Sequence, residues 1–228
     1  MIRILSIESS GDVCSVALHT NHQLVDIIES TELNIHGEKL AVFVQEILQR
    51  NQLSVTDLAA IAVSEGPGSY TGLRIGVSLA KGLCYASEIP LIAVNTLQSL
   101  ALAIKIQNPD LDTSSILLPM IDARRMEVYM AGFNLELNQV IETKPVILDE
   151  NFELNLPSGY RFIAAGNGAK KLELIDSINP VKVLNDIMFS AKYIGDLASI
   201  KFEKQDFVDI AYFEPVYLKE FAVLLKKG

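Results

Sequence analysis

The spacing of apolar residues predicts a chain that begins with a meander of three strands. Apolar and polar residues alternate over 2–7, 13–18 and 23–29, and short polar turns separate these segments. Alternation with a period of two residues is typical of β-strands that bury one face. We therefore expect three neighbouring antiparallel strands at the start of the chain.

The period then changes to that of a helix, and helices and strands alternate. One helix face is marked by apolar residues spaced three or four apart: Leu40, Phe43, Val44, Ile47 and Leu48. Beyond it the pattern predicts strands over 60–64 and 91–94, a helix over about 71–86, and a further helix capped by Thr96. A meander followed by alternating helices and strands indicates a mixed sheet, which is α/β in class.

Residues 107–115 are polar, contain a proline and lack periodicity, and they form the clearest boundary in the chain. After them the plan restarts with strands over 116–121, 127–133, 140–148 and 161–165, a helix through 171–176 and a last helix over 191–203. We expect an N-terminal lobe (1–106), a linker (107–115) and a C-terminal lobe (116–228). Each lobe would be a mixed sheet with flanking helices, the second one reduced.

Composition narrows the class of protein further. The 228 residues are 50% apolar and 21% charged, so the chain can bury a core and does not fit a disordered protein. No apolar run reaches the roughly 18–20 residues of a membrane span. The start reads directly into a strand, and the two cysteines form no disulfide framework. We expect a cytoplasmic protein with no membrane partner.

The charge argues against nucleic-acid binding by the chain alone. It carries 19 Lys plus Arg against 28 Asp plus Glu, for a net charge of −9, and its cationic runs are no longer than two residues. Binding a nucleic acid replaces condensed cations with Lys and Arg. The isolated chain should therefore be a poor RNA or DNA binder.

The sharpest motif is the glycine-rich segment GPGSYTGLRIG at residues 66–76, between a predicted strand and helix. Loop amides and a helix N-terminus can bind an anion there, but the lysine of a Walker A loop is absent. A tight turn with close helix packing is the alternative interpretation. Gly72, Gly76 and Ala80 leave a bare helix stripe that another backbone, from this chain or a partner, could approach.

Two acids, Glu8 and Asp122, follow apolar strands in the two halves. Paired strand-end carboxylates can hold magnesium for phosphoryl chemistry, which would make the protein an actin-like ATPase or phosphotransferase. The alternative is that both acids simply face solvent. No pair of histidines has helical spacing, so a zinc-peptidase site of that type is set aside, and His36 has the ordinary place of a residue at a helix start.

Several segments together resemble the TsaB (YeaZ) family. They are Ile7–Ser10, Val13–Leu18, Gly66–Gly76, Pro119–Tyr129 and Pro215–Leu218. The segments occur in order over nearly the whole chain, and the resemblance is stronger over residues 1–133 than over 134–214.

The resemblance implies a two-lobed actin-like/RNase H-like (ASKHA) fold and a part in making N6-threonylcarbamoyladenosine beside the anticodon of tRNAs that read codons beginning with adenine. It implies a non-catalytic subunit that forms a heterodimer with the metal-bearing transferase TsaD and is joined by the ATPase TsaE. The tRNA would be held only indirectly, through the complex. No cofactor would be bound tightly, ATP or ADP would lie at the interface with the partner, and the chain alone could form a homodimer.

The resemblance also assigns residues to two sites. A vestigial nucleotide or phosphate site would comprise Glu8, Ser9, Ser10, Asp122, Arg124, Gly166 and Gly168. Glu8 stands where the family usually has Asp, and Arg124 follows Asp122 closely enough to crowd a phosphate. No residue is assigned as catalytic or metal-binding. The partner interface would be formed by the two early helices: His36, Leu40, Phe43, Val44, Ile47, Tyr70, Thr71, Gly72, Arg74, Ile75, Gly76 and Ala80.

Overall fold

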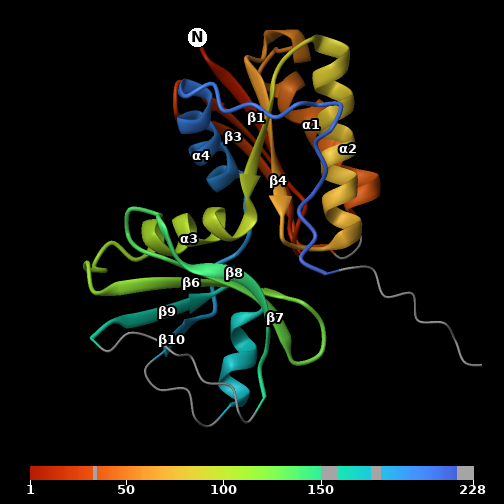
Figure 1. Ribbon diagram of the computed structural model, residues 1–228. Coiled ribbons are helices and arrows are strands. Elements are labelled where there is room, and N and C mark those ends of the chain that lie inside the picture. Colours follow the sequence, from red (N-terminus) through yellow and green to blue (C-terminus); the bar gives the residue numbers. More distant parts are fainter. Residues whose placement is uncertain (33–34, 150–158, 176–180, 220–228) are drawn as a thin grey trace, which may run out of the picture.

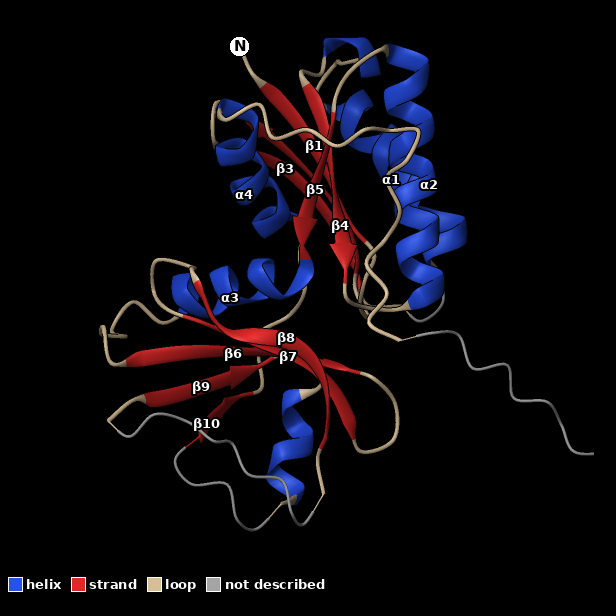
Figure 2. Ribbon diagram, viewed as in Figure 1, coloured by secondary structure: helices blue, strands red, loops and turns tan. Residues whose placement is uncertain are grey.

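The computed structural model describes residues 1–32, 35–149, 159–175 and 181–219, and it has two lobes, each with a five-stranded sheet (Figures 1 and 2). The first sheet has the order β3-β2-β1-β4-β5: β1 (Arg3–Glu8), β2 (Cys14–Thr20), β3 (Gln23–Ser30), β4 (Ala60–Gly66) and β5 (Leu91–Asn95). The second has the order β8-β7-β6-β9-β10: β6 (Ser115–Asp122), β7 (Glu127–Phe133), β8 (Gln139–Ile147), β9 (Arg161–Ala165) and β10 (Val181–Leu184).

The two sheets repeat one topology. In each, the first three strands are antiparallel neighbours, and the last two run parallel to the first. The predicted α/β class and the predicted tandem repeat are confirmed by this arrangement. The short strand β10 was not predicted, because it has only four residues and none of them is fully buried.

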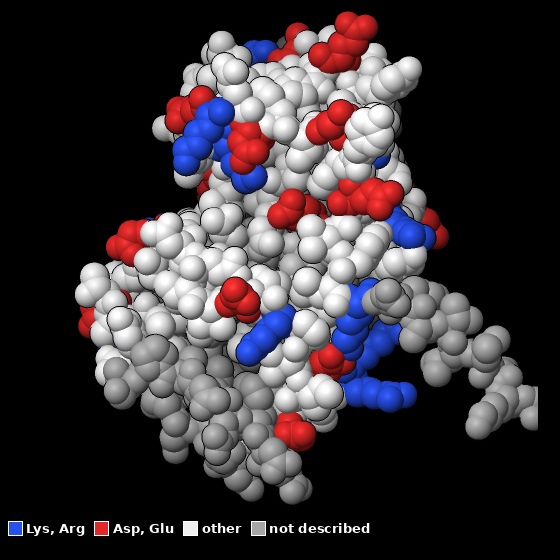
Figure 3. All heavy atoms as spheres, viewed as in Figure 1, with Lys and Arg blue, Asp and Glu red and all other residues white. Residues whose placement is uncertain are grey.

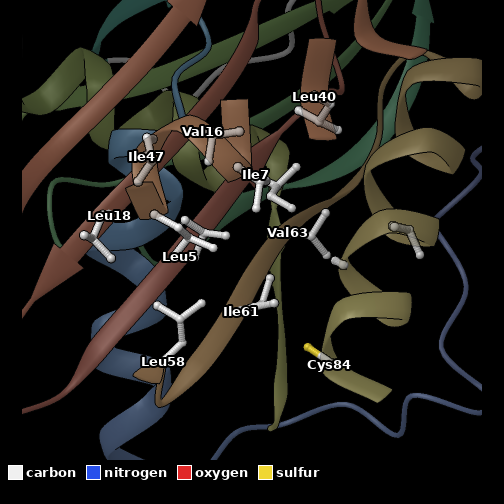
Figure 4. Close-up of a cluster of buried hydrophobic side chains, with 14 of the residues drawn as sticks. Leu5, Ile7, Val16, Leu18, Leu40, Ile47, Leu58, Ile61, Val63 and Cys84 are labelled. Carbon is white, nitrogen blue, oxygen red and sulfur yellow. The ribbon is translucent and has the colours of Figure 1, made fainter. Parts of the chain in front are cut away.

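Helices cover both faces of the first sheet (Figure 1). α1 (His36–Arg50) and α2 (Tyr70–Ser87) lie on one face, and α4 (Ala191–Glu203) lies on the other. The alternation of β1 explains this arrangement: Leu5 and Ile7 pack in the cluster beneath α1 and α2, whereas Ile4 packs against α4. Figure 4 shows Leu5 and Ile7 among the side chains of that first cluster.

The packing divides the chain differently from the predicted boundaries of 1–106, 107–115 and 116–228. α3 (Thr96–Gln107) lies on the second sheet, where its apolar residues join those of β6 and β9. In the other direction, α4 returns to the first sheet, because Ile194, Leu197 and Ala198 cover apolar residues of β1, β4 and β5. The chain after α4 also stays with the first lobe, where Val208 bridges Leu91.

Two local predictions were wrong. The helix expected through 171–176 is a 3-10 helix, η2 (Ala169–Leu174), and residue 176 lies outside the described residues. Asn95 rather than Thr96 caps α3, since the Asn95 Oδ1 accepts from the Gln98 amide at 3.0 Å. Thr96 instead accepts a hydrogen bond from the Gly66 amide at 3.2 Å and so ties β4 to α3. None of the described helices combines the length and apolarity needed to cross a membrane.

Candidate functional site

The bare stripe of α2 packs against the chain's own β1–β2 connection. A Cβ at Gly72 would overlap the Ser9 carbonyl oxygen, and one at Gly76 would overlap the Ser9 Oγ. The Ser9 hydroxyl donates to the Gly72 carbonyl at 2.9 Å, which fixes this close approach. Gly72, Gly76 and Ala80 are all buried. The prediction that they face a partner is therefore wrong, because the stripe is filled from within the chain.

The apolar face of α1 is internal for the same reason. Leu40, Val44 and Ile47 are almost completely buried in the first core cluster, so they too are not available to a partner. Other residues of the predicted interface do reach the surface of α1 and α2. Thr71 and Arg74 are exposed, and four further residues are half-buried: His36, Phe43, Tyr70 and Ile75.

An aromatic stack lies on this surface, where the end of the described chain crosses α2. The Arg74 guanidinium lies 4.0 Å from the centre of the Tyr70 ring, and its Nε donates to the Tyr217 hydroxyl at 3.2 Å. The Val216 amide donates to the Glu65 carbonyl at 2.8 Å, which holds Tyr217 in place. Sequence reasoning assigned Tyr70 and Arg74 to the surface, but it could not pair them with a residue more than 140 positions away.

Glu8, the last residue of β1, is enclosed within the first lobe. Its side chain is fully buried, and its Oε1 accepts from the Ser10 amide at 2.6 Å. Its Oε2 and the Ser10 Oγ have no hydrogen-bond partner among the described residues. Burial raises the pKa of the Glu8 carboxyl, because the charged form loses its hydration. The carboxyl therefore has no contact with solvent through which a hydrated magnesium ion could reach it.

Asp122 is held in another way, at the exposed end of β6. Lys171 donates to its Oδ1 at 2.8 Å, and the Arg124 amide donates to the same oxygen at 2.5 Å. The Asp122 amide donates to the Asn167 Oδ1 at 2.9 Å, and the Asn167 Nδ2 donates to the Asp12 Oδ2 at 2.8 Å. Asp122 therefore belongs to a polar seam between the lobes, and it makes no hydrogen bond to Glu8 in the described part of the chain.

The turn at Gly166 and Gly168 has a packing role. Gly166 has a φ of 104°, and a Cβ there would meet the Met120 carbonyl oxygen. At Gly168 a Cβ would come within 2.8 Å of the Ile121 carbonyl carbon. Both positions bring the turn against β6, which fits a strand-to-helix turn. No group of three or more potential metal ligands occurs among the described residues.

A histidine–aspartate pair that sequence reasoning missed joins α4 to the first sheet. The His19 Nε2 lies 3.2 Å from the Asp196 Oδ1, and the His19 side chain is 1% exposed. Gly195 packs directly on the imidazole ring, so a Cβ there would overlap it. Because the ring is covered in this way, the pair serves to fix α4 in place. Its signal in the sequence is weak, since 177 positions separate the two residues.

Comparisons with known proteins agree with this architecture. Residues 32–221 match the family described as TsaD: tRNA N6-adenosine threonylcarbamoyltransferase. The chain is 31% identical over 226 residues to the tRNA threonylcarbamoyladenosine biosynthesis protein TsaB of Escherichia coli (strain K12), which covers 96% of this chain and 95% of the relative. To the protein of the same name from Bacillus subtilis (strain 168) it is 32% identical over 155 residues, or 66% of this chain and 65% of the relative.

Solved structures agree on the fold. YeaZ from Pseudomonas aeruginosa superposes with a TM-score of 0.79 at 24% identity, over 96% of this chain and 100% of that one. An inorganic polyphosphate/ATP-glucomannokinase from Arthrobacter sp. strain KM gives a TM-score of 0.50 at 11% identity, over 90% and 100% of the two chains. The fold is the two-lobed actin-like (ASKHA) fold. Identity of 31%, sustained over nearly the whole of both chains, shows that this chain belongs to the TsaB (YeaZ) family.

Proposed function

We propose that this chain takes part in the biosynthesis of N6-threonylcarbamoyladenosine in tRNA as a non-catalytic subunit that supports a TsaD-like transferase. The names of its relatives support the pathway. The match of residues 32–221 to the TsaD family supports a paralogous partner. A tRNA N6-adenosine threonylcarbamoyltransferase from Kosmotoga olearia is itself 28% identical over 190 residues, or 73% of this chain and 57% of that protein.

The sealed state of Glu8 carries the non-catalytic role. In an actin-like site, a strand-end acid must reach a metal or a nucleotide phosphate. Here the acid is enclosed, its pKa is raised by burial, and Ser9 packs against the stripe of α2. The second acid, Asp122, is neutralised by Lys171. An ATPase or phosphotransferase that uses these two acids with magnesium therefore has no geometry in its favour.

The exposed parts of α1 and α2 form the proposed surface for the TsaD-like subunit. Thr71, Arg74 and Tyr217 are exposed, and the half-buried His36 and Ile75 lie beside them on the same two helices. The exposed apolar side chain of Val42 adds to this surface. An arginine that is stacked on Tyr70 and hydrogen-bonded to Tyr217 needs little further ordering to bind. Arginine and tyrosine are common among the residues that dominate binding energy.

The other partners in this proposal come from the family resemblance. A TsaE-like ATPase would join the pair, ATP or ADP would lie at the subunit boundary, and the isolated chain would hold no nucleotide tightly. Without the partner, the same helical surface would allow a homodimer. With a net charge of −9, the chain would leave most of the tRNA binding to the other subunits.

The test is to purify the chain together with the TsaD-like protein of the same organism. We expect the two to co-elute on size exclusion, and depletion of the chain should lower threonylcarbamoyladenosine in digested tRNA, as measured by mass spectrometry. Separate elution, or an unchanged content of the modified nucleoside, would refute the proposal.

A further inference from the structure

The turn between β6 and β7 carries two arginines in an unusual backbone conformation. Arg124 and Arg125 both have positive φ, at 71° and 48°, and both side chains are exposed. Consecutive residues with positive φ in a hairpin connection are usually Asn and Gly, because those residues adopt this conformation most readily. The geometry of the turn alone would therefore favour a different pair. We therefore infer that the two arginines are present for their side chains and not for the backbone conformation of the turn.

The two acids that flank this turn in the sequence are already paired with other cations. Asp122, which precedes the turn, accepts from Lys171 at 2.8 Å. Glu127, which follows it, is ion-paired with Lys219. Neither Arg124 nor Arg125 has an acidic partner within the described ranges of the chain. Both arginines are therefore exposed and have no acidic counter-charge among these residues.

Arg124 and Arg125 lie in a basic patch on the surface of an acidic protein. Figure 3 shows Lys and Arg side chains gathered where the second lobe meets the end of the described chain, while acidic residues are scattered over the rest of this face. Lys171 and Lys219 approach the turn from η2 and from the C-terminal segment. Asp12, across the seam between the lobes, is engaged by Asn167. Because Asp122 and Glu127 offset Lys171 and Lys219, the positive charge of the turn comes from its two arginines, on a chain whose net charge is −9.

We propose that Arg124 and Arg125 bind the phosphodiester backbone of RNA when the chain is part of its complex. This inference rests on the proposed function, which brings a tRNA to that complex. Guanidinium groups bind phosphate oxygens through paired hydrogen bonds, and they keep their charge at any physiological pH. The remaining acidic surface keeps the isolated chain a weak RNA binder, so the contact forms only on RNA that the other subunits already hold.

The test measures tRNA binding by the complex of this chain with the TsaD-like and TsaE-like proteins at 50 to 200 mM salt. The variant is Arg124→Asn with Arg125→Gly, which suits the turn and should leave the melting temperature unchanged or higher. Loss of two phosphate contacts should make the slope of log K against log[salt] shallower by about 1.5. Arg124→Lys with Arg125→Lys should keep most of the slope. As a matched control, Lys182→Gln with Lys204→Gln removes two exposed cations elsewhere and should leave the slope unchanged.

The other outcomes of this experiment distinguish failure of the arginine contact from failure of the proposed function. If the Asn-Gly variant assembles into the complex and the slope of log K against log[salt] equals that of wild type, the arginine contact is refuted. The proposed function then still stands. Weakened assembly with an unchanged slope would show that the turn binds protein, and it would also overturn the inference. If the wild-type chain does not join the TsaD-like protein at all, both the inference and the proposed function fail.

Discussion

Substitution of Gly76 by alanine separates an internal stripe from a partner surface. The added Cβ would overlap the Ser9 Oγ and lie 3.6 Å from the Ile7 Cγ2, so the Ser9 hydroxyl would have to leave its bond to the Gly72 carbonyl. Overpacking costs about 1–3 kcal/mol and the lost hydrogen bond costs about 1 kcal/mol. Alanine gains about 1 kcal/mol over glycine in a helix interior. We therefore expect Gly76→Ala to lower the free energy of unfolding by about 1–3 kcal/mol.

The same helix offers a matched control. Gly82 also lies within α2, but a Cβ there would meet nothing within 4 Å. Gly82→Ala should therefore raise the free energy of unfolding by up to about 1 kcal/mol. Both variants are compared by urea unfolding, followed by far-ultraviolet circular dichroism because the chain has no tryptophan. Adding Ser9→Ala to Gly76→Ala removes the overlapping hydroxyl, so the double variant should be destabilised by less than the sum of the two single changes.

Equal stability of Gly76→Ala and Gly82→Ala would show that Ser9 does not fill the stripe at Gly76. If Gly76→Ala at the same time lost its binding to the TsaD-like protein, the stripe would face a partner after all.

Three further predictions concern other parts of the molecule. Glu8→Gln should be more stable than wild type at pH 8 and should lose this advantage near pH 4. Folding raises the pKa of the Glu8 carboxyl, so the carboxyl costs stability as the pH rises above its unfolded pKa of 4.5. Urea unfolding of the two proteins at each pH checks this, and a difference in stability that persists at low pH would contradict it. Tyr217→Leu removes the contacts with Arg74 and should weaken binding to the TsaD-like protein roughly tenfold, as measured by calorimetry. Tyr212→Leu is the control, because the Tyr212 side chain is 84% exposed, and it should leave binding unchanged. Equal effects of the two substitutions would refute the role of the stack. Burial raises the pKa of Cys14 to about 11 and that of Cys84 to about 12. Neither thiol should therefore react with Ellman's reagent at pH 8 until urea unfolds the chain. Rapid labelling of the native protein would contradict this and show that the thiols are accessible.

The strands and helices could be predicted from the sequence because their periodicity is local. The period-two segments at the start became β1 to β3, and the helical spacing from Leu40 to Leu48 became α1. The lobe to which a helix belongs is different, because it depends on which sheet has an uncovered apolar face. The apolar residues Ile194 and Leu197 of α4 would suit either sheet, so the sequence boundaries left α4 with the wrong one.

The candidate site shows the same limit more sharply. Glu8 and Asp122 could be selected as strand-end acids from the sequence, but their surroundings come from distant residues. Ser9, which follows Glu8, donates its hydroxyl hydrogen bond to a helix residue more than 60 positions away. The glycine stripe itself was visible in the sequence, whereas the surface that fills it was not. Similarly, the positive φ of Arg124 and Arg125 opposes their local preference, and no sequence pattern predicts it.

We propose that the chain supports threonylcarbamoyladenosine formation without contributing a catalytic carboxylate. The direct measurement is the initial rate of this modification on tRNA by the reconstituted complex, with wild-type chain or with a Glu8→Gln, Asp122→Asn variant. We expect the two rates to lie within about twofold of each other, and little product to form when the chain is left out. A catalytic acid or base is worth about 100-fold or more in rate. A fall of that size in the variant, with the complex intact, would contradict the account.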